Sequence, residues 1–281
     1  MPDNESTVET IDDAIDDARF AQLAAAVREA GELTMTHFRQ GARIAGRIDW
    51  KPGNSPVTEV DLAVDKLLQA RLSALLPDAG WLSEETADTP ERLSRRTVLV
   101  VDPIDGTRAF MEGDPRFAVS VALVHDGRPV AAVLDAPALE QVFTARRGRG
   151  AFLNGQRIHA AAGHALQGAK LAGPRFLIDP VAQKIGMAAQ PKVPSLALRF
   201  AHVAAGFFEA AVASTDAHDW DIAAADLILH EAGAHLRTLD DKHPAYNRPE
   251  TKHGILVAST DPYLAPVRGA LIEMTKTSRK R

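Results

Sequence analysis

The feature that most constrains the fold is a short, wholly apolar run that leads directly into two aspartates. Residues 98–101 read Val-Leu-Val-Val, which is typical of a strand buried on both faces of a sheet. Asp102 and Asp105 follow, and Gly106 lets the backbone turn sharply after them. Paired carboxylates at a buried strand end repel each other unless a cation neutralises them, although an ordinary acidic turn has the same pattern. The run therefore predicts a buried sheet and makes a site for a hard cation such as Mg²⁺ a candidate.

Helical and strand patterns alternate around that run. Thr58 is a candidate N-cap with Asp61 three positions later, so a helix is expected to begin there. Asp126-Gly127 joins two strand-like runs, which predicts a hairpin. The expected helices are 20–38, 58–76, 196–212 and 221–232, the expected strands are 98–101, 117–125, 130–134, 141–152 and 255–258, and 50–55 is expected to be a loop. This alternation indicates a layered α/β protein.

The 281 residues suffice for one large domain or two compact lobes. The change of pattern places the boundary near residue 150. We expect an N-terminal α+β lobe at 18–150 that carries most of the acidic motifs, and a C-terminal α/β lobe at 151–270 that completes the site. Residues 1–17 and 271–281 are expected to be flexible tails.

Composition narrows the classes of function. The chain has no cysteine, which excludes disulfides and thiolate metal sites and suits a reducing cytoplasm. Its formal net charge is −5, whereas proteins that neutralise polynucleotide phosphates usually carry the opposite balance. No apolar run is long enough to span a membrane, and the acidic N-terminus has no signal-peptide pattern. We therefore expect a cytoplasmic protein with neither a membrane nor nucleic acid as its main partner.

Two further acidic segments flank the central one. Ser83-Glu84-Glu85 follows a short apolar run, and Asp221 lies in the sequence Trp-Asp-Ile-Ala-Ala at the start of an alanine-rich helix. Each has a structural explanation: Glu85 is expected to be a solvated neighbour, and an acid in the first helical turn complements the helix dipole.

Four motifs taken in order resemble those of the inositol monophosphatase superfamily, the lithium-sensitive, Mg²⁺-dependent phosphatases. They are Ser-Pro-Val-Thr-Glu-Val-Asp at 55–61, Ser-Glu-Glu at 83–85, Asp-Pro-Ile-Asp-Gly-Thr at 102–107 and Trp-Asp-Ile-Ala-Ala at 220–224. The resemblance spans roughly 20–260. It implies a layered α/β/α/β/α sandwich of the inositol monophosphatase and fructose-1,6-bisphosphatase type, and a homodimer.

The resemblance also implies roles for individual residues. Glu84, Asp102 and the Ile104 carbonyl would hold one Mg²⁺, and Asp102, Asp105 and Asp221 would hold a second; a third, looser ion would lie near Glu84. Thr107, with Glu84 or Asp61, would position and deprotonate the attacking water. The predicted contacts to the substrate are Asp105, Gly106, Thr107, Arg199 and Asp221. Backbone N–H groups of Gly106 and Thr107 would face the phosphate at a helix start.

The substrate is expected to be a small soluble phosphomonoester. Inositol monophosphatases typically carry a glutamate seven residues before the aspartate of the tryptophan motif, where this chain has Ser214; the nearest glutamate is Glu209. The segment 195–200 instead resembles bacterial 3′(2′),5′-bisphosphate nucleotidases, in which a basic residue at the place of Arg199 can meet the second phosphate. Arg108, which follows Gly-Thr, favours the same branch, and a surface cation is the alternative for Arg199. We expect a substrate such as 3′-phosphoadenosine 5′-phosphate, with inositol 1-phosphate second and histidinol phosphate or sugar bisphosphates after it.

A different class of function stays open from the sequence. Some members of the superfamily bind the transcription machinery, and the basic patch 146–149 is a candidate surface for such a regulatory role. The full set of acidic ligands favours an enzyme.

Overall fold

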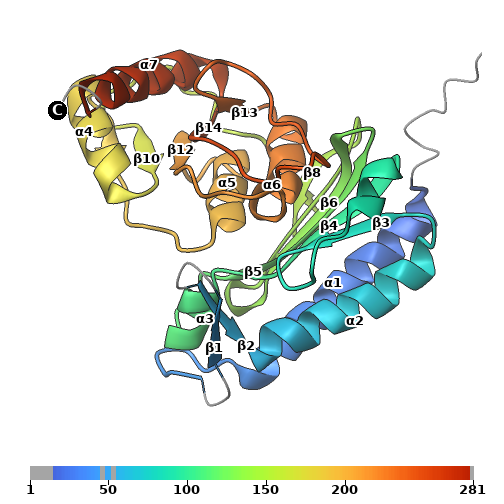
Figure 1. Ribbon diagram of the computed structural model, residues 1–281. Coiled ribbons are helices and arrows are strands. Elements are labelled where there is room, and N and C mark those ends of the chain that lie inside the picture. Colours follow the sequence, from blue (N-terminus) through green and yellow to red (C-terminus); the bar gives the residue numbers. More distant parts are fainter. Residues whose placement is uncertain (1–14, 45–47, 52–54, 279–281) are drawn as a thin grey trace, which may run out of the picture.

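The protein is a five-layered α/β/α/β/α sandwich, which confirms the expected fold class (Figure 1). The computed structural model describes residues 15–44, 48–51 and 55–278. Two sheets alternate with three layers of helices, and three separate hydrophobic clusters fill the spaces between the layers.

The larger sheet has seven strands in the order β3-β4-β5-β6-β7-β8-β9. They are β3 (Gly80–Ser83), β4 (Thr97–Asp105), β5 (Ala118–His125), β6 (Arg128–Ala136), β7 (Gln141–Arg146), β8 (Gly150–Leu153) and β9 (Gln156–Arg157). Strands β3 and β4 run parallel, and the other neighbours in this sheet run antiparallel. The apolar run 98–101 lies in β4, buried on both faces as predicted. Asp126 and Gly127 both have positive φ, as a tight hairpin turn between β5 and β6 requires.

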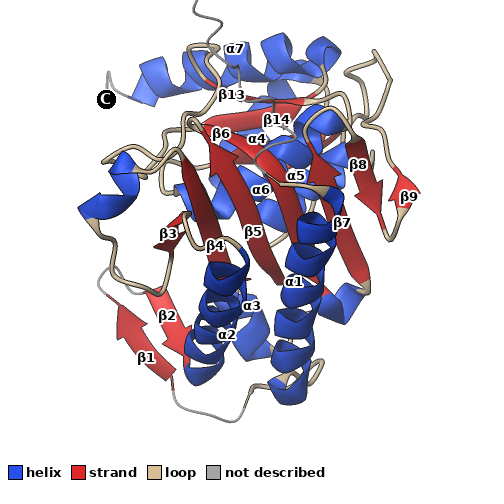
Figure 2. Ribbon diagram, turned by 90° about the vertical axis from the view of Figure 1, so that its right-hand side faces the viewer, coloured by secondary structure: helices blue, strands red, loops and turns tan. Residues whose placement is uncertain are grey.

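Helices α1 (Asp17–His37) and α2 (Glu59–Leu75) cover one face of this sheet, and Figure 2 shows both in front of its strands. The predicted N-terminus of α2 is confirmed. The Thr58 hydroxyl accepts from the backbone at Val60 and Asp61, and the Asp61 carboxylate accepts from the Thr58 N–H, which is a capping box. The apolar faces of the two helices pack on strands β4 to β6 and form one of the three hydrophobic clusters.

The smaller sheet has five strands in the order β11-β10-β12-β14-β13. They are β10 (Lys170–Ala172), β11 (Ala188–Ala189), β12 (Ala210–Ala213), β13 (His235–Thr238) and β14 (Leu256–Ser259). Helices α5 (Leu196–Ala204) and α6 (Asp219–Glu231) lie between the two sheets, and α4 (Arg175–Ile185) and α7 (Asp261–Ser278) cover the outer face. The remaining elements are the hairpin β1 (Ile48–Lys51) and β2 (Ser55–Thr58), α3 (Thr107–Glu112), and the 3₁₀ turns η2 (Pro90–Ser94) and η3 (Pro137–Leu139).

Several boundaries differ from the sequence-based expectation. The expected helix 196–212 ends at Ala204, because Gly206 takes a left-handed φ of 75° and the chain then enters β12. The expected loop 50–55 contains parts of two paired strands. The larger sheet continues past residue 150 through β9, which ends at Arg157, so the sheet crosses the expected boundary.

The expected tail at 271–281 is wrong for most of its length. Helix α7 continues to Ser278, and Leu271 is fully buried against the outer face of the smaller sheet. The expected tail at 1–17 lies mainly outside the described residues, although Ile15 is buried and α1 already begins at Asp17. No helix among the described residues is long and apolar enough to cross a membrane.

Candidate metal centre

Three carboxylates from two different elements converge between the sheets. Asp102 and Asp105 lie at the end of β4, and Asp221 lies in the first turn of α6. Each offers one oxygen, and these oxygens lie within 4.8 Å of one another. The convergence distinguishes the Asp-x-x-Asp segment from an ordinary acidic turn, because residues more than a hundred positions apart contribute to one cluster.

Asp102 is the most constrained member of the cluster. It is buried, and neither of its carboxylate oxygens has a hydrogen-bond partner among the described residues. Burial, followed by the charges of Glu84, Asp105 and Asp221, raises its pKa well above the ordinary value. A buried carboxylate without a partner is costly, so this geometry fits a divalent cation that balances the charge.

Asp105 is held in place by the start of α5. Its Oδ2 accepts from the Ser195 hydroxyl at 2.5 Å and from the Ala197 N–H at 2.6 Å. Burial raises its pKa to about 6, and these hydrogen bonds act in the opposite direction. One oxygen is thus occupied by the protein, which orients the carboxylate toward Asp102 and Asp221.

Glu84 lies just after β3, close enough to Asp102 and Asp61 to raise the pKa of both carboxyls. The turn that carries it is fixed by Asp65 of α2. The Ser83 hydroxyl donates to Asp65 Oδ1 and the Thr86 hydroxyl to Asp65 Oδ2, each at 2.5 Å. Asp65 was not predicted from the sequence, although its position four residues after Asp61 places both acids on one face of the helix. Glu85 is half-buried, and its N–H donates to the Ser83 hydroxyl oxygen.

Thr107 and Asp61 meet beside this cluster. The Thr107 hydroxyl lies 3.0 Å from Asp61 Oδ1 and 3.0 Å from the Ile104 carbonyl oxygen. Asp61 Oδ2 accepts from the Thr58 backbone and hydroxyl. Burial raises the pKa of Asp61 to about 6 despite these hydrogen bonds. The capping residue of α2 and the residue that starts α3 are therefore joined through one carboxylate.

Gly106 separates β4 from α3. Its φ is 95°, a left-handed conformation that favours glycine, and an added Cβ would lie 3.3 Å from the Ser195 backbone nitrogen. The start of α3 is thus packed tightly against the start of α5.

The start of α6 is fixed by a second set of contacts. Asp221 accepts from the His218 N–H at 2.6 Å, and the His218 ring stacks on Trp220 with centroids 4.6 Å apart. Asp219 is fully buried, and its Oδ1 lies 2.7 Å from His253 Nε2.

The predicted phosphate contact at Arg199 is not supported by the structure. Arg199 is only 4% exposed, and its guanidinium donates to the carbonyl oxygens of Val193 and Val212. It therefore holds the segment before α5 against β12, and the alternative of a surface cation is also wrong. Its charge nevertheless lies near enough to Asp105 to lower the pKa of that carboxyl.

Glu209 and the basic patch 146–149 make contacts elsewhere in the protein. Glu209, the nearest glutamate before the tryptophan motif, accepts from the Lys170 backbone and so ties β10 to the segment before β12. In the basic patch 146–149, two of the arginines bind different parts of the protein. Arg146 pairs with Asp17 and donates to the Ile15 carbonyl, whereas Arg147 donates to the Pro129 carbonyl.

Comparison with known proteins identifies the family to which the chain belongs. A sequence profile described as the inositol monophosphatase family matches residues 16–273. A histidinol-phosphatase of Chlorobaculum parvum is 34% identical over 223 residues, which are 75% of this chain and 83% of that protein. The 3′(2′),5′-bisphosphate nucleotidase CysQ of Aggregatibacter actinomycetemcomitans is 31% identical over 235 residues, covering 80% of this chain and 86% of CysQ.

The fold agrees with these sequence matches. The solved structure of an IMPase from Thermotoga maritima superposes with a TM-score of 0.81 at 25% identity, covering 94% of this chain and 99% of that one. Profile, relatives, fold and converging carboxylates agree: the chain belongs to the inositol monophosphatase family and is a metal-dependent phosphoric monoester hydrolase.

Proposed function

We propose that the protein is a Mg²⁺-dependent phosphatase whose metal ions are held by Glu84, Asp102, Asp105 and Asp221. The observation that carries this proposal is the buried Asp102 carboxylate, which lacks a hydrogen-bond partner among the described residues and lies beside Asp105 and Asp221. Oxygen ligands alone favour a hard ion such as Mg²⁺. The Ile104 carbonyl, adjacent to the same acids in β4, is a further proposed ligand.

Bound Mg²⁺ would polarise the phosphate and make water a better nucleophile near neutral pH. The chain itself supplies orientation and a route for the proton. Thr107 can accept a hydrogen bond from the attacking water while its own hydroxyl donates to Asp61, which is buried and has a pKa of about 6. Asp61 is thus poised to take up a proton near neutral pH through Thr107, and Glu84 is the alternative base.

We propose a 3′(2′),5′-bisphosphate nucleotide as the substrate, with Arg108 in the role that Arg199 cannot fill. Arg108 is exposed, follows Thr107 directly, and lies over the Trp50 ring with its guanidinium carbon 5.5 Å from the ring centroid. Trp50 is 55% exposed. An exposed guanidinium suits a second phosphate and an exposed indole suits a nucleobase, and the likeness to CysQ is consistent with both.

The test is the activity of the purified protein with Mg²⁺ on four phosphate esters: 3′-phosphoadenosine 5′-phosphate, inositol 1-phosphate, histidinol phosphate and fructose 1,6-bisphosphate. The expected result is the highest kcat/KM for the bisphosphate nucleotide. Arg108→Ala should lower that value by roughly 10- to 150-fold, the cost of a charge-assisted hydrogen bond, and leave inositol 1-phosphate nearly unchanged. A higher kcat/KM for histidinol phosphate or inositol 1-phosphate would overturn the substrate assignment and keep the phosphatase.

Three expectations from the family complete the proposal: a homodimer, cytoplasmic residence and inhibition by Li⁺. Light scattering tests the first, cell fractionation the second, and the same phosphatase assay the third. A transcription-binding role stays a prediction, because the internal hydrogen bonds of Arg146 and Arg147 do not test it.

A further inference from the structure

We propose that Asn247 is a positioning residue that fixes the Glu84 turn relative to Asp221 and so sets the geometry of the metal centre. This inference rests on the proposed metal-binding roles of those two acids. They come from different layers of the sandwich, since Glu84 follows a strand of the larger sheet and Asp221 lies in the first turn of a helix packed on that sheet. The two segments must be held at a constant separation if both acids are to bind the same cluster of ions.

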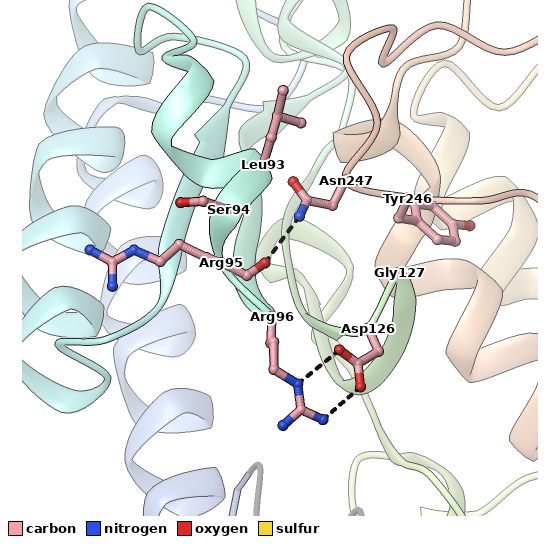
Figure 3. Close-up of a pocket in the computed structure, with 8 residues that line it drawn as sticks. All are labelled: Leu93, Ser94, Arg95, Arg96, Asp126, Gly127, Tyr246 and Asn247. Atoms are coloured by element: carbon pink, nitrogen blue, oxygen red, sulfur yellow. Dashed lines mark hydrogen bonds and ion pairs between the residues drawn. The ribbon is translucent and has the colours of Figure 1, made fainter.

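The side chain of Asn247 binds the segment that follows the Glu84 turn. Its Nδ2 donates to the carbonyl oxygens of Arg92 at 3.2 Å and Arg95 at 3.3 Å, and its Oδ1 accepts from Arg92 Nη1 at 2.9 Å. Figure 3 shows Asn247 pointing from its own loop toward the Arg95 backbone, beside a cavity of about 240 Å³ that the Asp126–Gly127 turn also lines. An amide is needed here, because the site requires both donors and an acceptor.

Arg92 carries this contact back toward Glu84. Its side chain is 2% exposed, its guanidinium pairs with both oxygens of Asp88 at 2.6 and 2.7 Å, and it donates to the Arg248 carbonyl at 3.0 Å. Asp88 lies four residues after Glu84, so the far end of the turn is tied to Arg92 while Asp65 holds its near end. The whole turn is thereby braced against the loop that contains Asn247.

The backbone of Asn247 binds the start of α6, the helix that carries Asp221. Its N–H donates at 3.1 Å to Oδ2 of the fully buried Asp219, the first residue of α6 and two residues before Asp221. Asp219 is held in turn by the Thr251 carbonyl and by His253. One residue therefore contacts both the 90–95 segment and the N-terminus of α6.

The conformation of Asn247 is also special. Its φ is 54°, a left-handed conformation that asparagine tolerates better than most residues. A purely structural loop asparagine exists elsewhere in the chain for comparison. Asn154 has φ 50°, and its side chain bonds the Val142 N–H and the Glu140 carbonyl, both near it in the sequence and on the outer strands of the larger sheet. The two residues share backbone geometry and hydrogen-bond type, but of the two only Asn247 joins the halves of the metal centre.

The test compares Asn247→Gly with Asn154→Gly in the full-length protein. Glycine keeps the left-handed backbone accessible, so each change removes only side-chain hydrogen bonds. The measurements are the melting temperature in EDTA, the Mg²⁺ dissociation constant by calorimetry, and kcat at saturating Mg²⁺. Both variants should lose some stability in EDTA. Only Asn247→Gly should weaken Mg²⁺ binding, by roughly 10-fold, the lower end of the effect of groups that orient metal ligands.

A second variant, Asn247→Asp, tests the same hydrogen bonds with a side chain of nearly the same size. It retains an acceptor for Arg92 but turns an oxygen toward the carbonyls of Arg92 and Arg95, so Mg²⁺ binding should weaken at least as much as in Asn247→Gly. Wild-type Mg²⁺ affinity in both Asn247 variants, or an equal loss in Asn154→Gly, would overturn the inference. If the wild-type protein neither binds Mg²⁺ nor hydrolyses phosphate esters, the proposed function fails instead.

Discussion

At the scale of single residues, the site depends on carboxylates that are unfavourable on their own. Asp102 is buried beside Asp105, Asp221 and Glu84, and each of these neighbours raises its pKa further. The protein without metal therefore carries repulsion that a bound cation removes. The residues proposed to bind the metal therefore make the metal-free fold less stable, as is common at functional sites.

Asp102→Asn should separate these two effects. We expect activity to fall by at least ~10³-fold, because metal-assisted charge stabilisation contributes several kcal/mol to such reactions. The melting temperature in EDTA should rise, because the change removes a carboxyl that Glu84, Asp105 and Asp221 repel. Phosphatase assays and thermal unfolding of the same preparation measure both. Wild-type turnover at saturating Mg²⁺ would contradict the assignment of Asp102.

For Arg199 we predict a loss of stability, whereas for Asp102 we predict a gain. Because its guanidinium holds the Val193 and Val212 carbonyls inside the protein, Arg199→Ala should destabilise the fold by about 1.5–3 kcal/mol. Losses in kcat/KM should be equal for a bisphosphate and a monophosphate substrate. Denaturant unfolding and the two assays test this together. A loss in kcat/KM for the bisphosphate substrate alone would instead support the role predicted from the sequence, in which Arg199 binds the second phosphate.

At the scale of elements, helix α1 packs closely on β6 where Gly31 meets Asp135. An added Cβ on Gly31 would lie 2.1 Å from Asp135 Oδ2, so this approach of helix and sheet depends on a residue without a side chain. Asp135 is 5% exposed, and burial raises the pKa of its carboxyl to about 7, with Arg28 acting against this rise and Glu32 acting in the same direction. An ionisable group is thus enclosed between an outer helix and the larger sheet, on the face of that sheet opposite α6.

The raised pKa of Asp135 predicts a pH dependence of stability. The folded protein holds this proton more tightly than the unfolded chain, so the contribution of Asp135 becomes less favourable as pH rises from about 4 to about 7. Asp135→Asn should therefore be more stable than wild type at pH 8, and the difference should shrink toward pH 4. Urea unfolding across this range measures it. Asp126→Asn is the control, because Arg96 holds the pKa of that exposed carboxyl below its ordinary value and the sign of any effect is reversed.

At the scale of the whole molecule, the proposed metal centre joins strand β4 of the larger sheet to helix α6 of the inner layer. A cation bound there should stabilise both parts at once. We expect Mg²⁺ at 100 times its Kd to add about 2.7 kcal/mol to the free energy of unfolding. The melting temperature should rise accordingly. Ca²⁺ should also raise it, yet inhibit hydrolysis, because it relaxes the octahedral geometry that Mg²⁺ imposes.

The comparison protein for this experiment is Asp102→Asn, which should show little increase in melting temperature with either ion. Full activity of the wild-type protein after exhaustive chelation would contradict the dependence on metal.

The sequence predicted those parts of the fold and site that depend on local pattern. The capping box of Thr58 and Asp61 and the Asp126-Gly127 turn are examples, because each is decided within a few residues. The acids of the cluster were found because their motifs are short and distinctive. The prediction for Arg199 was wrong because the sequence around a basic residue near a helix start is the same in both cases: when the side chain faces solvent and when it binds the carbonyls of another strand. Asp65 and Asn247 were missed because their roles consist of contacts with segments 18 to 155 positions away.

The proposed metal ligands and the proposed contacts to the rest of the substrate lie on different elements, which has a consequence for the history of the family. Four of the acids lie at the larger sheet or on the helix that covers it: Asp61, Glu84, Asp102 and Asp105. The proposed contacts to the rest of the substrate are Trp50 and Arg108, which lie on a hairpin and a short helix at the margin of that sheet. Mutations can alter that margin without disturbing a buried strand. On the proposed assignments, selection can exchange one phosphate ester for another while the metal ligands are kept, consistent with relatives named histidinol-phosphatase and bisphosphate nucleotidase.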